Sequence, residues 1–152
     1  MSVENLVHPK KGSLQRQIAE LALTRKAKEV VILDLRKLTS MTDYFVVCTG
    51  ESETQVKAIA DAITSGMEKI GERAWHTEGL QNLQWVLLDY VDVVVHVFHR
   101  DARAYYGIEK LWGDAVIHKV VDRKPRAMGK EQRAEAKETK AKEKSFSQGK
   151  VD

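Results

Sequence analysis

The sequence predicts a single α/β domain in which helices cover a sheet. Two runs rich in valine, leucine and aromatic residues, 85–90 and 93–98, favour strands and lie close enough to be antiparallel neighbours. An amphipathic segment that starts at Ser52 has apolar residues at helical spacing. Both faces of the strand 85–90 carry large apolar side chains. One face serves the core, and the other needs a cover, either the protein's own helices or another macromolecule.

The first half of this domain is predicted as a helix followed by two strands. Ser13 is the expected N-cap of a helix with an apolar stripe, which ends near Lys28. The apolar run 29–35 predicts a buried strand. After a polar link, residues 44–48 predict a second strand.

The second half begins with the clearest helix of the sequence. Ser52 and Gln55 fit a reciprocal capping box, in which each side chain satisfies an unpaired backbone donor, and Gly71 supplies the stop. A short strand around 73–77 precedes the two strands at 85–90 and 93–98. The predicted sheet therefore has five strands.

A last helix is predicted from Asp101 to Gly113. Its large apolar side chains are spaced to pack inward, at Tyr105, Ile108, Leu111 and Trp112. Aromatic residues at such spacing usually belong to the core, so we expect Trp112 and at least one tyrosine to be buried. Trp85 stands at a strand start and is instead a candidate for an exposed interface anchor.

Composition divides the chain into a flexible N-terminus (1–12), one globular domain (13–121) and a basic tail (122–152). The tail buries too little apolar surface to offset its ordering entropy, so we predict that it is disordered. Residues 1–121 hold 15 Lys and Arg against 16 Asp and Glu, whereas the tail holds 10 against 6. The near-neutral domain disfavours general phosphate binding, and only the tail suits salt-sensitive attraction to RNA.

Cysteine usage and hydropathy indicate an intracellular protein. The single cysteine, Cys48, excludes an internal disulfide and a multi-cysteine metal site, which fits a reducing compartment. No apolar stretch approaches the roughly 20 residues of a membrane-spanning helix, and the N-terminus lacks the pattern of a signal peptide. We expect a soluble cytoplasmic protein with no membrane contact.

Several residues resemble parts of catalytic or metal-binding motifs. His76 and Glu78 match the start of a zinc deaminase signature, but the downstream cysteine pair that this chemistry needs is absent, which favours a structural or partner-binding role. His96 and His99 would point to opposite faces of a strand, which disfavours a shared metal. Cys48 lies in an apolar run, where a thiol usually behaves as a small core residue.

Asp89 and Asp92 bracket the turn between the two strands at 85–90 and 93–98. Acids at such positions commonly bond nearby backbone groups, so a turn role and a partner contact are both open and can coexist. A nucleotidyltransferase would need two carboxylates on a strand after the turn at Gly50 to hold magnesium, but the residues that follow are helical. We therefore predict no metal, no cofactor and no catalysis.

Six blocks of sequence follow one another in a fixed order: Asp43 to Gly50, Val56 to Asp61, His76 to Gly79, Trp85 to Tyr90, Asp92 to Phe98 and Glu109 to Asp114. Over residues 14–115 the chain closely resembles the ribosomal silencing factor family, also called Iojap-related. The resemblance implies a mixed sheet flanked by helices, related in architecture to nucleotidyltransferases but without their catalytic carboxylates.

The resemblance also implies a function without catalysis. Such a regulator binds the large ribosomal subunit through large-subunit ribosomal protein fourteen, blocks subunit joining and represses translation under nutrient limitation. A homodimer is implied for the free protein. Carried over position by position, the partner contact falls on a sheet surface and a nearby loop, at His76, Glu78, Trp85, Leu87, Asp89, Asp92, Tyr105 and Lys110.

Two features depart from the family pattern. Val91 stands where the family usually has glycine, and because a β-branched residue resists positive φ, we expect a turn of another type there. The basic extension after Val121 exceeds the common family core, and a contact with ribosomal RNA is the role that we consider for it.

Two competing interpretations remain open. A nucleotidyltransferase with displaced metal ligands, Asp34 and Asp43, predicts nucleotide binding that depends on magnesium. An RNA-binding module driven by residues 122–152 predicts an affinity for the ribosome that falls steeply with salt.

Overall fold

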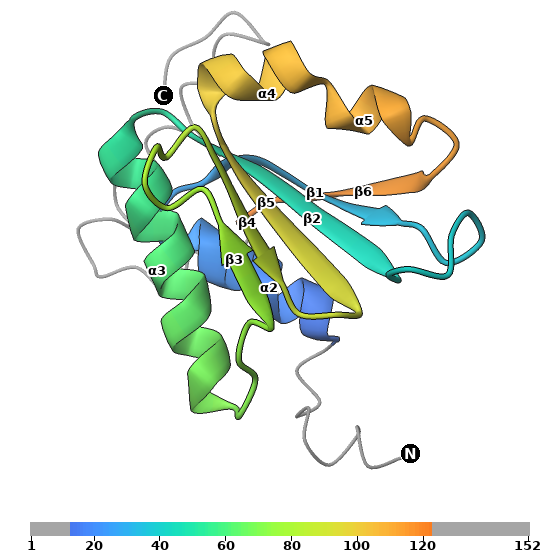
Figure 1. The fold of residues 1–152 in the computed structure, drawn as a ribbon, viewed down its shortest axis with the longest axis horizontal. Helices are drawn as coiled ribbons and strands as arrows, with labels where there is room; N and C mark the ends of the chain where they lie inside the picture. The colour runs from blue at the N-terminus through green and yellow to red at the C-terminus, as the bar shows by residue number, and fades with distance from the viewer. Residues whose placement is uncertain (1–12, 123–152) are drawn as a thin grey trace, which may run out of the picture. The chain divides into compact units, whose positions relative to one another are not determined.

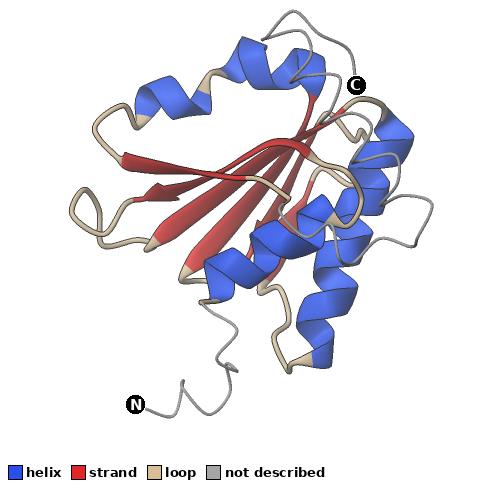
Figure 2. Cartoon of the chain, turned by 180° about the vertical axis from the view of Figure 1, so that it is seen from behind, coloured by secondary structure: helices blue, strands red, loops and turns tan. Residues whose placement is uncertain are grey.

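The computed structural model describes residues 13–122. The predictions for residues 1–12 and 123–152 therefore lie outside the described residues. Within the described part a six-stranded mixed sheet has helices on both faces (Figures 1 and 2), which confirms the predicted α/β class. No helix between residues 13 and 122 is long and apolar enough to cross a membrane.

The helices are α2 (Leu14–Leu23), α3 (Glu53–Lys69), α4 (Arg100–Tyr106) and α5 (Ile108–Leu111), and the strands are β1 (Lys28–Asp34), β2 (Tyr44–Gly50), β3 (His76–Glu78), β4 (Trp85–Asp89), β5 (Val93–His99) and β6 (Val116–Val120). The strand order is β3-β4-β5-β2-β1-β6. Only β2 and β5 pair in parallel within this sheet. The predicted antiparallel pairing of β4 with β5 is confirmed, with Trp85 opposite Phe98.

Each face of the sheet has its own apolar core. Helices α2 and α3 pack on one face and bury the larger cluster, which includes Ile18, Ile59 and Val95. Helices α4 and α5 lie over the other face, above a smaller cluster around Leu33 and Phe98. The protein's own helices thus cover one face broadly. On the second face they leave β3 and part of β4 accessible to a partner.

The helix starts differ in how they are capped. Ser52 Oγ accepts from the Gln55 backbone N–H at 3.1 Å, as predicted. The reciprocal bond differs, because Gln55 Oε1 accepts from Glu51 N–H rather than from Ser52 N–H. Ser13 is the N-cap of α2, as predicted, but its side chain makes no capping bond. Helix α2 also ends at Leu23, before the predicted end near residue 28.

The sixth strand, β6, was not predicted. It pairs with β1 at an edge of the sheet, and of its five residues only Val120 is buried. A mostly exposed edge strand lacks the buried apolar run by which a central strand is found. The β-branched residues Val116 and Ile117 were the available signal.

The predicted last helix is divided in two by Gly107, which adopts a left-handed conformation with φ of 55°. The break turns Tyr105 and Leu111 into solvent, with 81% and 78% exposure, so the prediction that both pack inward is wrong. Ile108 is buried as expected, whereas Trp112 is only half-buried. A buried tyrosine was also expected, and Tyr90 at 6% exposure confirms it.

Candidate partner-binding surface

Strands β3 and β4 present a strip of sheet that α4 and α5 do not fully cover. Glu78 pairs with Leu87, and His76 pairs with Asp89. Paired residues on neighbouring strands point to the same face, and Trp85, Leu87 and Asp89 alternate along β4. Five predicted site residues therefore share this surface, which we call the open face: His76, Glu78, Trp85, Leu87 and Asp89.

Trp85 stands at the boundary between the open face and the smaller core. It is half-buried rather than fully exposed, with its ring 5.0 Å from that of Phe98 and 4.7 Å from that of Tyr106. Its indole Nε1 donates to His96 Nδ1 at 3.0 Å. The N–H is thus committed inside the protein, and the accessible part of the ring offers a partner an apolar contact.

His96 supports Trp85 from beneath. It is 3% exposed, and burial lowers the pKa of its imidazole to about 4, so the ring is neutral at pH 7. Because Nδ1 accepts from Trp85, the proton of the neutral ring lies on Nε2, which has no hydrogen-bond partner among the described residues. The ring packs edge-to-face with Phe45 at 4.4 Å between centroids.

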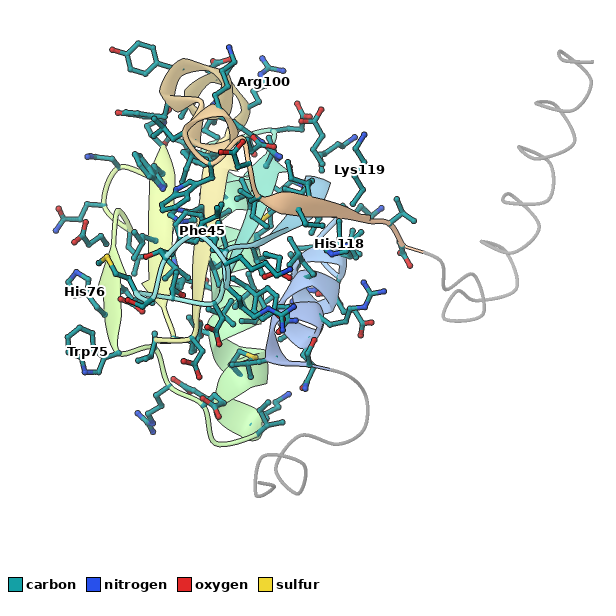
Figure 3. The ribbon with its side chains drawn as sticks, turned by 90° about the vertical axis from the view of Figure 1, so that its right-hand side faces the viewer. Phe45, Trp75, His76, Arg100, His118 and Lys119 are labelled. Atoms are coloured by element: carbon teal, nitrogen blue, oxygen red, sulfur yellow. The ribbon has the colours of Figure 1, made fainter. Side chains whose placement is uncertain are left out.

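His76 and Glu78 form an exposed pair on the edge strand β3. His76 Nε2 and Glu78 Oε2 are 2.7 Å apart, and the two side chains are 49% and 64% exposed. Figure 3 shows His76 and Trp75 pointing outward on the same side of the domain, away from His118 and Lys119. The pair contributes polar groups and an acid to the rim of the open face.

Of the two acids at the β4–β5 turn, Asp89 has the predicted side-chain bond to the backbone, and among the described residues no such bond is found at Asp92. Asp89 Oδ1 accepts from Val91 N–H at 2.8 Å, which confirms the turn role predicted for Asp89. At Asp92 the carbonyl oxygen, not the carboxylate, accepts from the N–H groups of Asp43 and Tyr44. The Asp92 side chain stays in solvent beside the open face.

The expectation that Val91 avoids positive φ is wrong. Its φ is 75°, and the Asp92 N–H donates to the Tyr90 carbonyl at 2.9 Å. This i to i+2 bond makes a γ-turn, so the turn is of another type, as expected, within a two-residue loop that is closed by the bond from the Tyr90 N–H to the Val93 carbonyl. The ladder on either side holds Val91 in this conformation despite its branched side chain.

Tyr105 and Lys110 lie on the helices above the sheet. The Tyr105 ring meets that of Tyr106 edge-on at 5.0 Å, and Tyr106 packs on Trp85, so Tyr105 is continuous with the open face. Lys110 is exposed on α5. In the described part of the chain, no hydrogen bond, ion pair or ring contact joins Lys110 to that face.

Arg103, which the sequence analysis did not single out, holds these helices in place. It is 8% exposed, and its Nη1 donates to the Glu29 carbonyl at 2.6 Å and to Thr49 Oγ1 at 2.9 Å. Its Nε and Nη2 donate to the two carboxylate oxygens of Glu109 at 3.0 and 2.8 Å. The bidentate pair fastens α4 to α5, the Nη1 bonds fasten α4 to β1 and β2, and together they position Tyr105.

Trp75 is a second residue that the sequence analysis missed. Trp75 lies immediately before β3 and its side chain is 77% exposed, while its backbone N–H donates to the Asp89 carbonyl at 2.7 Å. Residues 73–77 were expected to form a strand, and this expectation did not indicate that the Trp75 side chain would be exposed. An exposed tryptophan is an unusual use of a large apolar side chain, and it lies beside His76 at the edge of the open face.

Asp34 and Cys48, which were considered for catalysis, have perturbed pKa values. Among residues 13–122 no group of three His, Cys, Asp and Glu side chains could hold a metal ion. Both carboxylate oxygens of Asp34 accept from the Arg36 guanidinium, and this hydrogen bonding lowers the pKa of Asp34 to about 2. Burial raises the pKa of the Cys48 thiol to about 12, so it is not a ready nucleophile.

Comparison with known proteins identifies similar sequences. A family profile described as "Ribosomal silencing factor during starvation" matches residues 8–149. Ribosomal silencing factor RsfS of Halalkalibacterium halodurans is 47% identical over 60% of this chain and 78% of its own length. RsfS of Bacillus subtilis is 42% identical over 68% of this chain and 91% of its own. The chloroplastic protein Iojap of Zea mays is 36% identical over 64% and 42%, respectively.

Two solved structures share the fold. A crystal structure of a Bacillus halodurans protein aligns with a TM-score of 0.60 and 40% identity, over 70% of this chain and 96% of that protein. A crystal structure of a Chromobacterium violaceum protein aligns with a TM-score of 0.61 and 37% identity, over 72% and 95%, respectively. The α/β architecture of residues 13–122 therefore recurs in experimentally determined structures.

Proposed function

The chain belongs to the ribosomal silencing factor family, and we propose that it acts in the cytoplasm by binding large-subunit ribosomal protein fourteen on the large ribosomal subunit. The open face, with Asp92, Tyr105 and Lys110 around it, is the proposed contact. Bound there, the domain occupies the surface that the small subunit must approach. Repression of translation is then steric, and no bond is made or broken.

One observation carries this proposal: the open face is apolar in the middle and acidic at its rim. Leu87 and the accessible part of Trp85 supply the apolar area. Glu78, Asp89 and Asp92 surround it with carboxylates. Such a surface matches a partner that is apolar at its centre and basic around it, because complementary charges speed encounter and exclude wrong partners.

The rigid support beneath the face adds to the argument. The bond from Trp85 to His96 and the packing of Tyr106 hold the aromatic anchor in one orientation before any partner arrives. A pre-organised anchor loses little conformational freedom on binding. Trp85→Ala is therefore a poor test, because it also removes packing from the core and weakens the fold.

The sharper test reverses one rim charge. Asp92→Lys places a positive charge in the proposed contact without removing a described side-chain bond, so affinity should fall about tenfold or more. Glu68→Lys changes another exposed acid, on α3 behind the opposite face of the sheet, and is the matched control. Co-sedimentation with purified large subunits measures affinity, and light scattering after addition of small subunits measures joining.

The outcomes separate the functional classes. Loss of both activities in Asp92→Lys, with Glu68→Lys unchanged, supports the proposal, and normal subunit joining at saturating protein contradicts it. A calorimetric titration with ATP and magnesium tests the nucleotidyltransferase alternative, which requires heat of binding. A salt-dependent affinity carried by residues 122–152 would favour the RNA-binding alternative.

The proposal has two further features, of which the first comes from the family resemblance and the second from the basic charge of residues 122–152. The free protein is proposed to form a homodimer, which sedimentation velocity over a range of concentrations tests. The basic tail is proposed to add a contact with ribosomal RNA. This contact predicts that affinity for the large subunit weakens as salt increases, while affinity for the isolated ribosomal protein changes less.

A further inference from the structure

Val91 stands out because its backbone conformation suits glycine and its side chain faces solvent. Its φ of 75° belongs to a γ-turn, and the side chain is 55% exposed. Lys26, Glu29 and Leu83 also have positive φ, but none of them is β-branched. Branching at Cβ makes this region costly, so valine here is strained where glycine would be relaxed.

The surrounding backbone, rather than the valine side chain, maintains this turn. Asp89 Oδ1 accepts from the Val91 N–H at 2.8 Å, and the Tyr90 N–H donates to the Val93 carbonyl at 2.8 Å. The Asp92 carbonyl is tied to the start of β2. The side chain of Val91 therefore adds strain to the fold, with more than half of its surface left in water.

Trp75 lies beside this turn. The backbone N–H of Trp75 donates to the carbonyl of Asp89, whose carboxylate accepts from the Val91 N–H. The Trp75 side chain is 77% exposed. Two large apolar side chains are thus exposed near the end of β4. Asp43 and Asp92, whose backbones are joined by a hydrogen bond of 2.9 Å, place exposed acids at the same end.

We propose that Val91 and Trp75 form a second apolar contact with the ribosomal protein, extending the docking surface from the open face around the β4–β5 turn. This inference rests on the proposed function and adds two contact residues to it. The occupant is a basic protein surface, because Asp43 and Asp92 would repel the same acidic edge of a second copy. The strain at Val91 is retained because the exposed side chain contributes to binding.

Val91→Gly tests the inference because it should raise thermal stability and weaken binding to large subunits. Removing the strained side chain should raise the melting temperature by about 2 to 8 °C. Binding to large subunits should weaken about fivefold, as expected for losing the burial of roughly half a valine side chain. A residue with only a structural role would not separate these two measurements.

Trp75→Ala and a matched control complete the experiment. Trp75→Ala should weaken binding about tenfold or more with little change in melting temperature, since most of its ring is in solvent. Val121→Gly removes an equally exposed valine, at 62%, which follows β6 at the other edge of the sheet. It should leave binding unchanged.

Each result of the experiment supports or refutes a specific part of the proposal. If the unmodified protein does not bind large subunits, the proposed function fails. If it binds and Val91→Gly binds as tightly, the function stands and the second contact is refuted. A lower melting temperature in Val91→Gly would refute the assigned strain. A change confined to self-association, seen by sedimentation velocity, would assign the residue to a copy of this chain and overturn the inference.

Discussion

Acidification should destabilise the domain through His96. Burial lowers the pKa of this imidazole to about 4, whereas the unfolded chain titrates near 6.5. Between these values the unfolded state binds a proton that the folded state does not. Stability that is fully present above about pH 6.5 is therefore lost as the pH falls towards 4.

The two pKa values set the size of the effect. A fall in pKa from 6.5 to about 4 corresponds to roughly 3 kcal/mol once His96 is fully protonated, and most of this is lost by about pH 4.5. The hydrogen bonding of His96 agrees with a loss of stability at low pH. A second proton must enter at Nδ1, the atom that accepts from Trp85 Nε1 at 3.0 Å, so protonation also breaks that bond.

Urea unfolding followed by circular dichroism, at about pH 7 and about pH 4.5, measures this loss. His96→Phe cannot titrate and is the comparison. The unmodified protein should lose roughly 2 to 3 kcal/mol more than the variant between the two pH values. Asp34 does not interfere, because a carboxyl with a pKa held near 2 loses its contribution only below about pH 4. Parallel losses in the two proteins would refute the argument from burial.

Two substitutions probe the supports of the site. Gly79→Ala should cost about 2 kcal/mol or more in thermal unfolding, because Gly79 has φ of 88° and a Cβ there would collide with the Trp85 carbonyl oxygen; a stability equal to that of the unmodified protein would contradict this close approach. Arg103→Met should cost about 3 kcal/mol in urea unfolding, since it leaves Glu109 without its bidentate partner. A loss below about 1 kcal/mol would show that α4 and α5 do not depend on this arginine.

Helix α3 and the β4–β5 pair followed from local sequence. The Ser52 cap and the apolar period of α3 are set within a few residues, and so is the alternation of the two valine-rich strands. Predictions from the local hydrophobic pattern failed at an edge strand of the sheet and at a glycine that breaks a helix. An edge strand such as β6 needs little burial, and Gly107 stopped a helix whose apolar spacing alone would have continued.

The family resemblance predicted the candidate site residues, and the register of the sheet decided which of them lie together. Glu78 and Leu87 are nine residues apart in the chain but form a pair between β3 and β4. The half-burial of Trp85 and the role of Arg103 depend on side chains from distant elements. No local pattern contains such contacts.

The amino-acid sequence by itself determined the α/β class, the family, and the acidic and apolar residues available for a partner, because period, caps and motif order are properties of neighbouring residues. The tertiary structure alone decided that Trp85 is anchored on a buried neutral histidine and that Val91 takes a conformation its side chain disfavours. Burial and hydrogen bonds between distant segments set both features, and their energies outweigh local preference.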